Sequence, residues 1–120
     1  MSRQSIPFDG FPAPAAAAIK IDWRGDHFGP NNTYQAGGYN LNASSLGMSN
    51  FEFVEMSAFS QTGNYYARAT FPANSGNSET RAIPPTYVVV KWYIAANGVE
   101  VSNNNTVIGG ECSQLWASGI

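Results

Sequence analysis

The stretch TYVVVKWYIAANGVEVSNNNT, residues 86–106, limits the possible folds more than any other part of the chain. Tyr87–Ile94 is rich in β-branched and aromatic residues, which favours a strand. Asn97 and Gly98 follow, and this dipeptide predicts a type I′ turn because glycine readily adopts positive φ. Residues 99–101 then predict a shorter return strand. The stretch therefore indicates a β-hairpin in which a long apolar strand is the main element.

The rest of the chain repeats this alternation of strand-like runs and turn residues. No window shows sustained helical periodicity, and residues 42–50 predict a turn or a single helical turn. We expect residues 24–33 and 72–85 to be loops, and residues 51–58 and 64–71 to form a hairpin through Ser60 and Gly63. Further strands are predicted at residues 19–23, at 34–41 with a break at Gly37, and at 111–120. The sequence predicts an all-β fold, a single-domain antiparallel β-sandwich or small barrel of about six to eight strands.

Length and proline content predict two segments within one domain. A chain of 120 residues suits one core. Residues 1–16 are expected to be an extended N-terminal arm, because prolines and glycine exclude a helix. Its apolar residues Ile6, Phe8 and Phe11 are the candidate partner-binding residues, and residues 17–120 are the expected β-domain.

Charged residues are scarce. They make up 12% of the chain, against about 25% in an average soluble domain. Interface cores are depleted in charge, so partners could cover part of the surface; a neutral surface rich in Asn, Ser and Thr is the alternative. The formal net charge of −2 and six scattered basic residues argue against nucleic-acid binding.

Targeting signals are not evident in the N-terminal region. Prolines and Asp9 interrupt the apolar residues there, and the alanine run at residues 15–18 is too short to span a membrane. We therefore expect synthesis in a cytoplasm without export and no membrane partner.

No pattern of catalytic residues emerges. Cys112 is the only cysteine and His27 the only histidine, and they lie far apart in the sequence. Glu52 and Glu55 have opposite parity on their predicted strand, so they do not form a same-face acid pair. We expect neither an enzyme nor a cofactor, and Cys112 is interpreted as a small buried apolar residue.

The segment around residue 25 offers two motifs. Arg24-Gly25-Asp26 matches an integrin-type tripeptide, although glycine before aspartate is also ordinary turn chemistry. Asp22, Asp26 and His27 carry metal-ligating atoms, but one loop alone does not supply a complete shell. We therefore interpret the segment as a solvated turn, without a metal.

Aromatic residues are frequent enough to form a sugar-stacking platform. Trp23, Trp92, Trp116 and the tyrosines are the candidates, with Asn side chains for the hydroxyl groups. Trp92 lies in a run that is apolar on both sides, which favours core packing for this residue.

Two segments together resemble a known class of proteins. GGYNLNASSLGMSNFEFVEMSAFSQTGNYYARATF has a Gly-Gly, a Leu-Gly step, a Phe-x-Phe-Val strand and a Gly-x-Tyr strand, and YVVVKWYIAANGVEVSNNNT adds a Lys-aromatic strand, a Gly-Val-Glu-Val return and a polar loop. This order resembles small virion structural proteins of tailed bacteriophages, of the capsid decoration or cement type. The resemblance covers about residues 37–120, and the ending CSQLWASGI is shorter and more polar than that of the family.

The resemblance implies a non-enzymatic function. A cement protein binds and stabilises the assembled shell of the major capsid protein, on the capsid surface of the virion, after synthesis in the host cytoplasm. It also implies a homotrimer, since icosahedral shells offer local three-fold axes and three linked contacts give avidity. The alternative is a carbohydrate- or receptor-binding module of a phage tail or fibre, which the aromatic residues, the Asn-rich loops and the Arg-Gly-Asp tripeptide favour.

Overall fold

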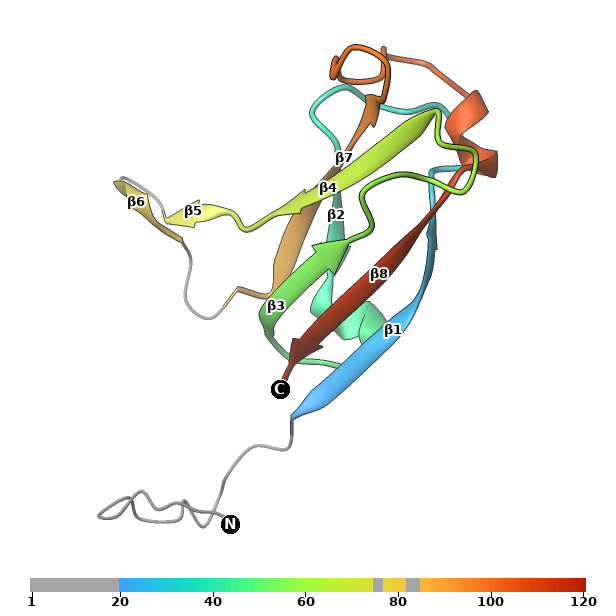
Figure 1. Cartoon of the computed structure of the whole chain (residues 1–120). Helices are drawn as coiled ribbons and strands as arrows, with labels where there is room; N and C mark the ends of the chain where they lie inside the picture. The colour runs from blue at the N-terminus through green and yellow to red at the C-terminus, as the bar shows by residue number, and fades with distance from the viewer. Residues whose placement is uncertain (1–19, 75–76, 82–84) are drawn as a thin grey trace, which may run out of the picture.

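The computed structural model describes residues 20–74, 77–81 and 85–120. The expected arm, with Ile6, Phe8 and Phe11, lies outside the described residues. Strands dominate the described chain (Figure 1), which confirms the predicted all-β class. In chain order the elements are β1 (Ile21–Phe28), β2 (Tyr39–Asn42), the 3-10 helix η1 (Ala43–Leu46), β3 (Phe51–Met56), β4 (Tyr65–Thr70), β5 (Ala73–Asn74), β6 (Asn77–Arg81), β7 (Tyr87–Ile94), the 3-10 helix η2 (Val107–Gly110) and β8 (Cys112–Gly119).

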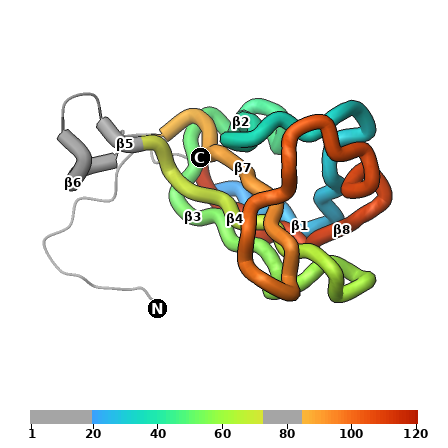
Figure 2. The backbone as a smooth tube through the Cα atoms, turned by 90° about the horizontal axis from the view of Figure 1, so that it is seen from above, coloured from blue at the N-terminus to red at the C-terminus, as the bar shows by residue number. Residues whose placement is uncertain are grey.

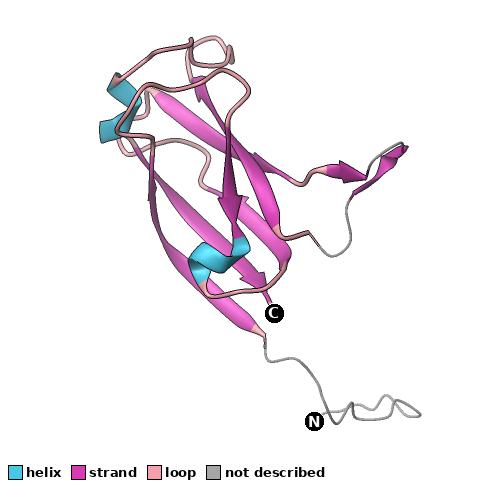
Figure 3. Ribbon diagram, turned by 180° about the vertical axis from the view of Figure 1, so that it is seen from behind, coloured by secondary structure: helices cyan, strands magenta, loops and turns pink. Residues whose placement is uncertain are grey.

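Six of the strands form two antiparallel three-stranded sheets packed face to face. One sheet has the order β1-β8-β3 and the other the order β2-β7-β4. The remaining strands, β5 and β6, pair with each other and extend away from the two sheets (Figures 1 and 3). This arrangement is a β-sandwich, one of the two architectures that the sequence predicts.

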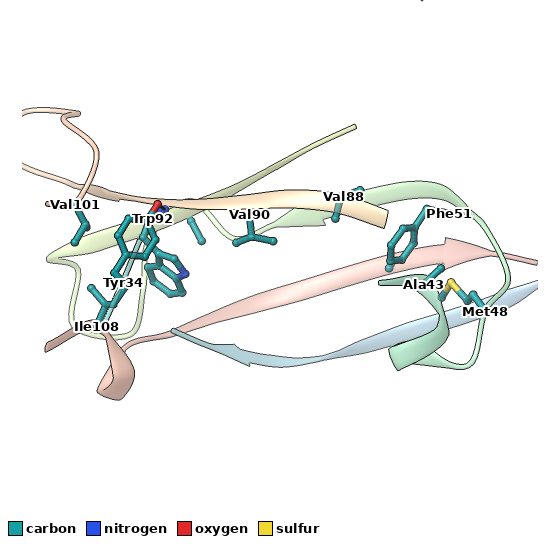
Figure 4. Close-up of a cluster of buried hydrophobic side chains, with 11 residues drawn as sticks. Tyr34, Ala43, Met48, Phe51, Val88, Val90, Trp92, Val101 and Ile108 are labelled. Atoms are coloured by element: carbon teal, nitrogen blue, oxygen red, sulfur yellow. Dashed lines mark hydrogen bonds between the residues drawn. The ribbon is translucent and has the colours of Figure 1, made fainter. Parts of the chain in front are cut away.

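The core fills the space between β7 and β8. Val88, Val90 and Trp92 alternate along β7 and are fully buried, as the apolar run predicts. Leu115 and Ala117 of β8 face them from the other sheet and are also buried. Figure 4 shows Trp92 packed with Tyr34 and Ile108 at one end of this core and Phe51 with Met48 at the other. Both predicted strands, residues 87–94 and 111–120, are thus the central strands of their sheets.

The turn after β7 differs from the predicted type I′. Gly98 has a φ of 70°, as expected, but Asn97 does not have the positive φ that type I′ also requires. A longer loop forms instead, in which the Gly98 N–H donates to the Ile94 carbonyl at 2.8 Å. The Asn97 side chain accepts from the Val99 N–H at 3.0 Å and stabilises this wider loop. The return strand is reduced to one bridge, between Tyr93 and Glu100.

The hairpin predicted between residues 51–58 and 64–71 is wrong. β3 pairs with β8 and β4 pairs with β7, so loop 57–64 crosses from one sheet to the other. The Ser60 and Thr62 hydroxyls both donate to the Glu111 carboxylate at 2.6 Å. The Gln61 side chain donates to the Gly110 carbonyl at 2.8 Å. These bonds hold the loop against the start of β8.

Two further predictions need correction. The expected loop at residues 24–33 begins only after Phe28, because Arg24 to Phe28 continue β1 in register with β8. The expected loop at residues 72–85 contains β5 and β6. The single helical turn predicted within residues 42–50 is confirmed as η1.

Candidate functional site

An aromatic patch lies on the outer face of the β1-β8-β3 sheet. Arg24 of β1, Trp116 of β8 and Glu55 of β3 form one row across the three strands, because Trp116 is the register partner of both. Phe53 of β3 lies beside this row, and Gln114 precedes it on the outer side of β8. We call these five residues the Trp116 face.

A β-bulge produces this patch. The register between β3 and β8 shifts between Phe51 and Phe53, so Glu52 is the extra residue. Phe51 is buried in the core, whereas Phe53 is turned outward and 39% exposed. The bulge also leaves both Glu52 and Glu55 exposed, so the strict alternation assumed from the sequence does not hold.

The aromatic rings of the Trp116 face pack against each other and against the Arg24 guanidinium. The Phe53 and Trp116 ring centroids lie 5.0 Å apart, edge to face. The Arg24 guanidinium lies 4.3 Å from the Trp116 centroid, a cation–π contact. Trp116 is nevertheless 39% exposed, so the face presents a pre-ordered but partly uncovered indole.

A hollow of about 340 Å³ borders this patch. Arg24, Glu55, Gln114 and Trp116 line it, together with the end of β3. It therefore offers a cation, a carboxylate, an amide and an aromatic surface next to one another. Asp26 lies next to the hollow and accepts a hydrogen bond from the Gln114 side chain.

The Arg-Gly-Asp tripeptide lies within β1, not in a loop. Arg24 and Asp26 point outward and Gly25 points inward. A side chain at Gly25 would collide with the Trp23 ring, because its Cβ would lie 2.8 Å from Cη2. The glycine is therefore explained by the packing of Trp23 and does not indicate an integrin loop.

The structure separates the residues considered for a metal or a thiol catalyst. Asp22 and Asp26 point outward from β1, whereas His27 points into the sandwich. No group of metal-ligating side chains occurs within the described residues. Cys112 is half-buried on the outer side of β8, and burial together with Asp26 raises the pKa of its thiol. His27 does not activate it, since their side chains lie on opposite sides of the sheet.

His27 belongs instead to a partly buried row of hydrogen-bonded side chains that the sequence does not reveal. The Trp92 Nε1–H donates to the Tyr39 hydroxyl oxygen at 3.0 Å, and the Tyr39 hydroxyl lies 2.6 Å from Nε2 of His27. A neutral His27 with an unprotonated Nε2 can accept the Tyr39 hydroxyl proton in this arrangement. Burial lowers the pKa of His27 and raises that of Tyr39 to about 12, so both groups stay neutral. These hydrogen bonds link β1, β2 and β7 and stabilise the packing of the core.

A second polar cluster closes the sandwich end above Trp92. The buried Tyr34 hydroxyl donates to the Glu100 carboxylate at 2.7 Å and accepts from the Trp92 backbone N–H at 3.2 Å. The Gly37 N–H donates to the same Glu100 oxygen at 2.7 Å. These hydrogen bonds, that from Tyr34 first, lower the pKa of Glu100, while burial and Glu100 raise the pKa of Tyr34. The cluster gives a hydrogen-bond partner to the Trp92 backbone N–H, where the β2–β7 pairing has ended.

Comparison of the chain with protein-family models, with curated proteins and with solved structures gave no match. Among the helices in the described part of the chain, none is long and apolar enough to cross a membrane.

Proposed function

We propose that this chain is a non-enzymatic structural protein of a phage virion, of the cement type, that binds the assembled shell of the major capsid protein. The observation that carries the proposal is the Trp116 face, where Trp116, Phe53 and Arg24 stand pre-ordered on a rigid sheet. The low charge of the chain and the resemblance to phage decoration proteins also support it.

The chemistry of the Trp116 face suits a protein partner. Trp and Arg are enriched among the residues that dominate binding energy at protein interfaces. Arg24 is already held over the indole, so little side-chain freedom would be lost on binding. Homotrimer formation around local three-fold axes of the shell is part of the proposal, because three linked contacts give avidity to a face of modest size.

The proposal is tested by binding of the purified chain to empty heads of the phage that encodes it. Trp116→Ser should weaken attachment at least about tenfold, since hot-spot truncations cost about 2 kcal/mol or more. Phe59→Ser is the matched control, because Phe59 is 56% exposed but lies in loop 57–64 and not on the Trp116 face. Equal attachment of Trp116→Ser and wild type in a head-sedimentation assay would remove the Trp116 face as the docking surface.

A carbohydrate- or receptor-binding module remains the second candidate. The hollow beside Trp116, with the polar groups of Glu55 and Gln114 on its wall, favours this function. Titration of the chain with host surface oligosaccharides, followed by tryptophan fluorescence, separates the two candidates. A saturable change that Trp116→Ser abolishes supports the sugar site, and no change supports the protein partner.

A further inference from the structure

The sandwich has an open side where the edge strands β3 and β4 face each other. β3 is the outer strand of one sheet and β4 the outer strand of the other, and loop 57–64 connects them (Figures 1 and 2). A hollow of about 260 Å³ lies between them, lined by residues 54–58 and 66–69. Both strands therefore present a free backbone edge to the same groove.

The free edge of β3 consists of Val54 and Met56. The Ser57 N–H donates to the Gln114 carbonyl of β8 at 2.9 Å. Backbone groups alternate in direction along an antiparallel ladder, so Glu55 also points to β8, and Val54 and Met56 point away from it.

The free edge of β4 consists of Ala67 and Ala69. The Ala95 N–H donates to the Asn64 carbonyl at 2.9 Å, so Tyr66 and Arg68 also direct their backbone groups to β7. Ala67 and Ala69 consequently direct theirs away from β7. Ala67 is 5% exposed, and a buried backbone group without a partner is costly.

We call Val54, Met56, Ala67 and Ala69 the β3–β4 seam. Within residues 20–74, 77–81 and 85–120, no strand pairs with the free side of these residues. Free edges of this kind accept an extended segment, whose main chain bonds to the edge and whose alternate side chains enter pockets on either side. The seam has the free backbone edges that such a segment needs. It also has a hollow on either side of β3, since the hollow at the Trp116 face and the hollow between β3 and β4 share residues 55–58.

We infer that the β3–β4 seam is a docking site for the N-terminal segment, residues 1–19, of a second copy of this chain. Ile6 and Phe8 stand two residues apart, so in an extended segment both side chains point to one side, into the seam. Pro7 lacks an N–H, which an edge position tolerates. The described chain begins next to β1, the edge of its sheet opposite to β3, and 19 extended residues span roughly 60 Å. The segment thus starts away from its own seam and is long enough to reach the seam of a neighbour.

This inference deepens the proposed function, because it names the contact between assembled copies. It rests on the proposed function for the idea that copies of the chain assemble. It is nevertheless tested without any shell. A failure of the Trp116 face to bind heads would leave the seam intact, and a failure of the seam would leave the Trp116 face intact.

The test uses the full chain with Ile6→Ser, Phe8→Ser and Phe11→Ser as a receptor whose seam is empty. A fluorescein-labelled peptide of residues 1–16 is titrated into it and followed by anisotropy. We expect saturable binding, at least tenfold weaker for the peptide with Phe8→Ser. Receptor carrying Val54→Pro in addition should also bind at least tenfold more weakly, because proline removes an N–H on the free side but none that bonds to β8. The two peptides are compared on one receptor, so their difference does not depend on how a substitution affects folding.

Light scattering of the unmodified chain identifies the copy that supplies the segment. We expect a mass above that of one chain for wild type and the mass of one chain for the triple-serine variant. The inference is overturned if the peptide does not bind saturably or if Phe8→Ser does not weaken it. A wild-type chain that stays a monomer at high concentration also overturns it, since the segment would then not come from a second copy.

Discussion

The two sides of the sandwich differ in how side chains link their strands. On the side of β1 and β2, hydrogen-bonded side chains link the strands: Tyr34 bonds to the Trp92 backbone, and Tyr39 joins His27 to the Trp92 indole. On the side of β3 and β4, no such hydrogen-bonded side chains join the two strands within the described residues, and a hollow of about 260 Å³ lies between them.

The difference teaches where stability and binding reside in a small sandwich. Buried polar groups that are fully paired fix one arrangement of the two sheets. A free edge contributes less to the fold but can receive a partner. We therefore call the first side the closed side and the second the open side. Substitutions on the closed side should change the free energy of unfolding, whereas substitutions on the open side should change binding.

The largest expected effect on stability distinguishes the fully buried tryptophan, Trp92, from the most exposed one, Trp116. Trp92→Ala should lower the free energy of unfolding by about 3–5 kcal/mol, because Trp92 is fully buried and its removal leaves a cavity. Trp116→Ala should cost about 1 kcal/mol or less, since Trp116 is partly exposed on the outer face. Urea unfolding measures both, and similar losses would show that Trp116 is also part of the core.

The next effect compares two tyrosine hydroxyls. Tyr39→Phe should cost about 1–3 kcal/mol, because it leaves the buried Trp92 indole N–H without an acceptor. Tyr66→Phe, on the open side, should stay within about 0.5 kcal/mol, because its hydroxyl makes no hydrogen bond to the described residues. Thermal unfolding at one pH gives the comparison, and an equal loss for both variants would contradict the closed-side account.

A pH effect should also be confined to the closed side. The pKa of His27 is lowered from its ordinary value of 6.5, so the unfolded chain binds this proton more readily than the folded one. The contribution of neutral His27 is therefore fully present above about pH 6.5 and is lost as the pH falls towards its folded pKa, by at most about 1.4 kcal/mol per pH unit. The difference in unfolding free energy between wild type and His27→Gln should shrink from pH 7.5 to 5.5. A difference that does not change with pH would mean that His27 is not buried as a neutral acceptor.

The smallest predicted effect concerns the loop after β7. Gly98→Val should cost at least about 1 kcal/mol, because φ at Gly98 is 70° and a β-branched residue is strained there. Gly110→Ala is the control, since Gly110 has open space around its Cα and no positive φ. An unchanged melting temperature for Gly98→Val would show that the loop relaxes without cost.

Strands whose position in the sheet follows from their own residues could be predicted from the sequence. The run Tyr87–Ile94 is apolar on both sides and became the central strand of its sheet, and Trp92 was expected in the core. The inward side of β4, with Ala67 and Ala69, also follows from simple alternation. Central strands are easier to predict because strands pair with both of their edges and their inward side chains are buried.

The pairing between strands that are distant in the sequence could not be predicted in the same way. The pairing of β3 with β8 is accompanied by bonds from Ser60 and Thr62 to Glu111, about 50 positions away in the chain, and no local pattern shows them. The bulge at Glu52, which turns Phe53 outward, likewise depends on the partner strand. The Trp116 face therefore depends on three strands that are distant in the sequence and lie side by side in the sheet.

Amide hydrogen exchange, measured by NMR on the full chain, tests most directly whether the open side is the docking side. We predict that the amides of Val54, Met56, Ala67 and Ala69 are protected in concentrated wild type. They should exchange rapidly in the variant with Ile6→Ser, Phe8→Ser and Phe11→Ser. The Trp92 amide, which Tyr34 holds on the closed side, should stay protected in both and serves as the control. If the four seam amides exchange at the same rate in both proteins while Trp92 stays protected, the segment does not occupy the seam and the account is contradicted.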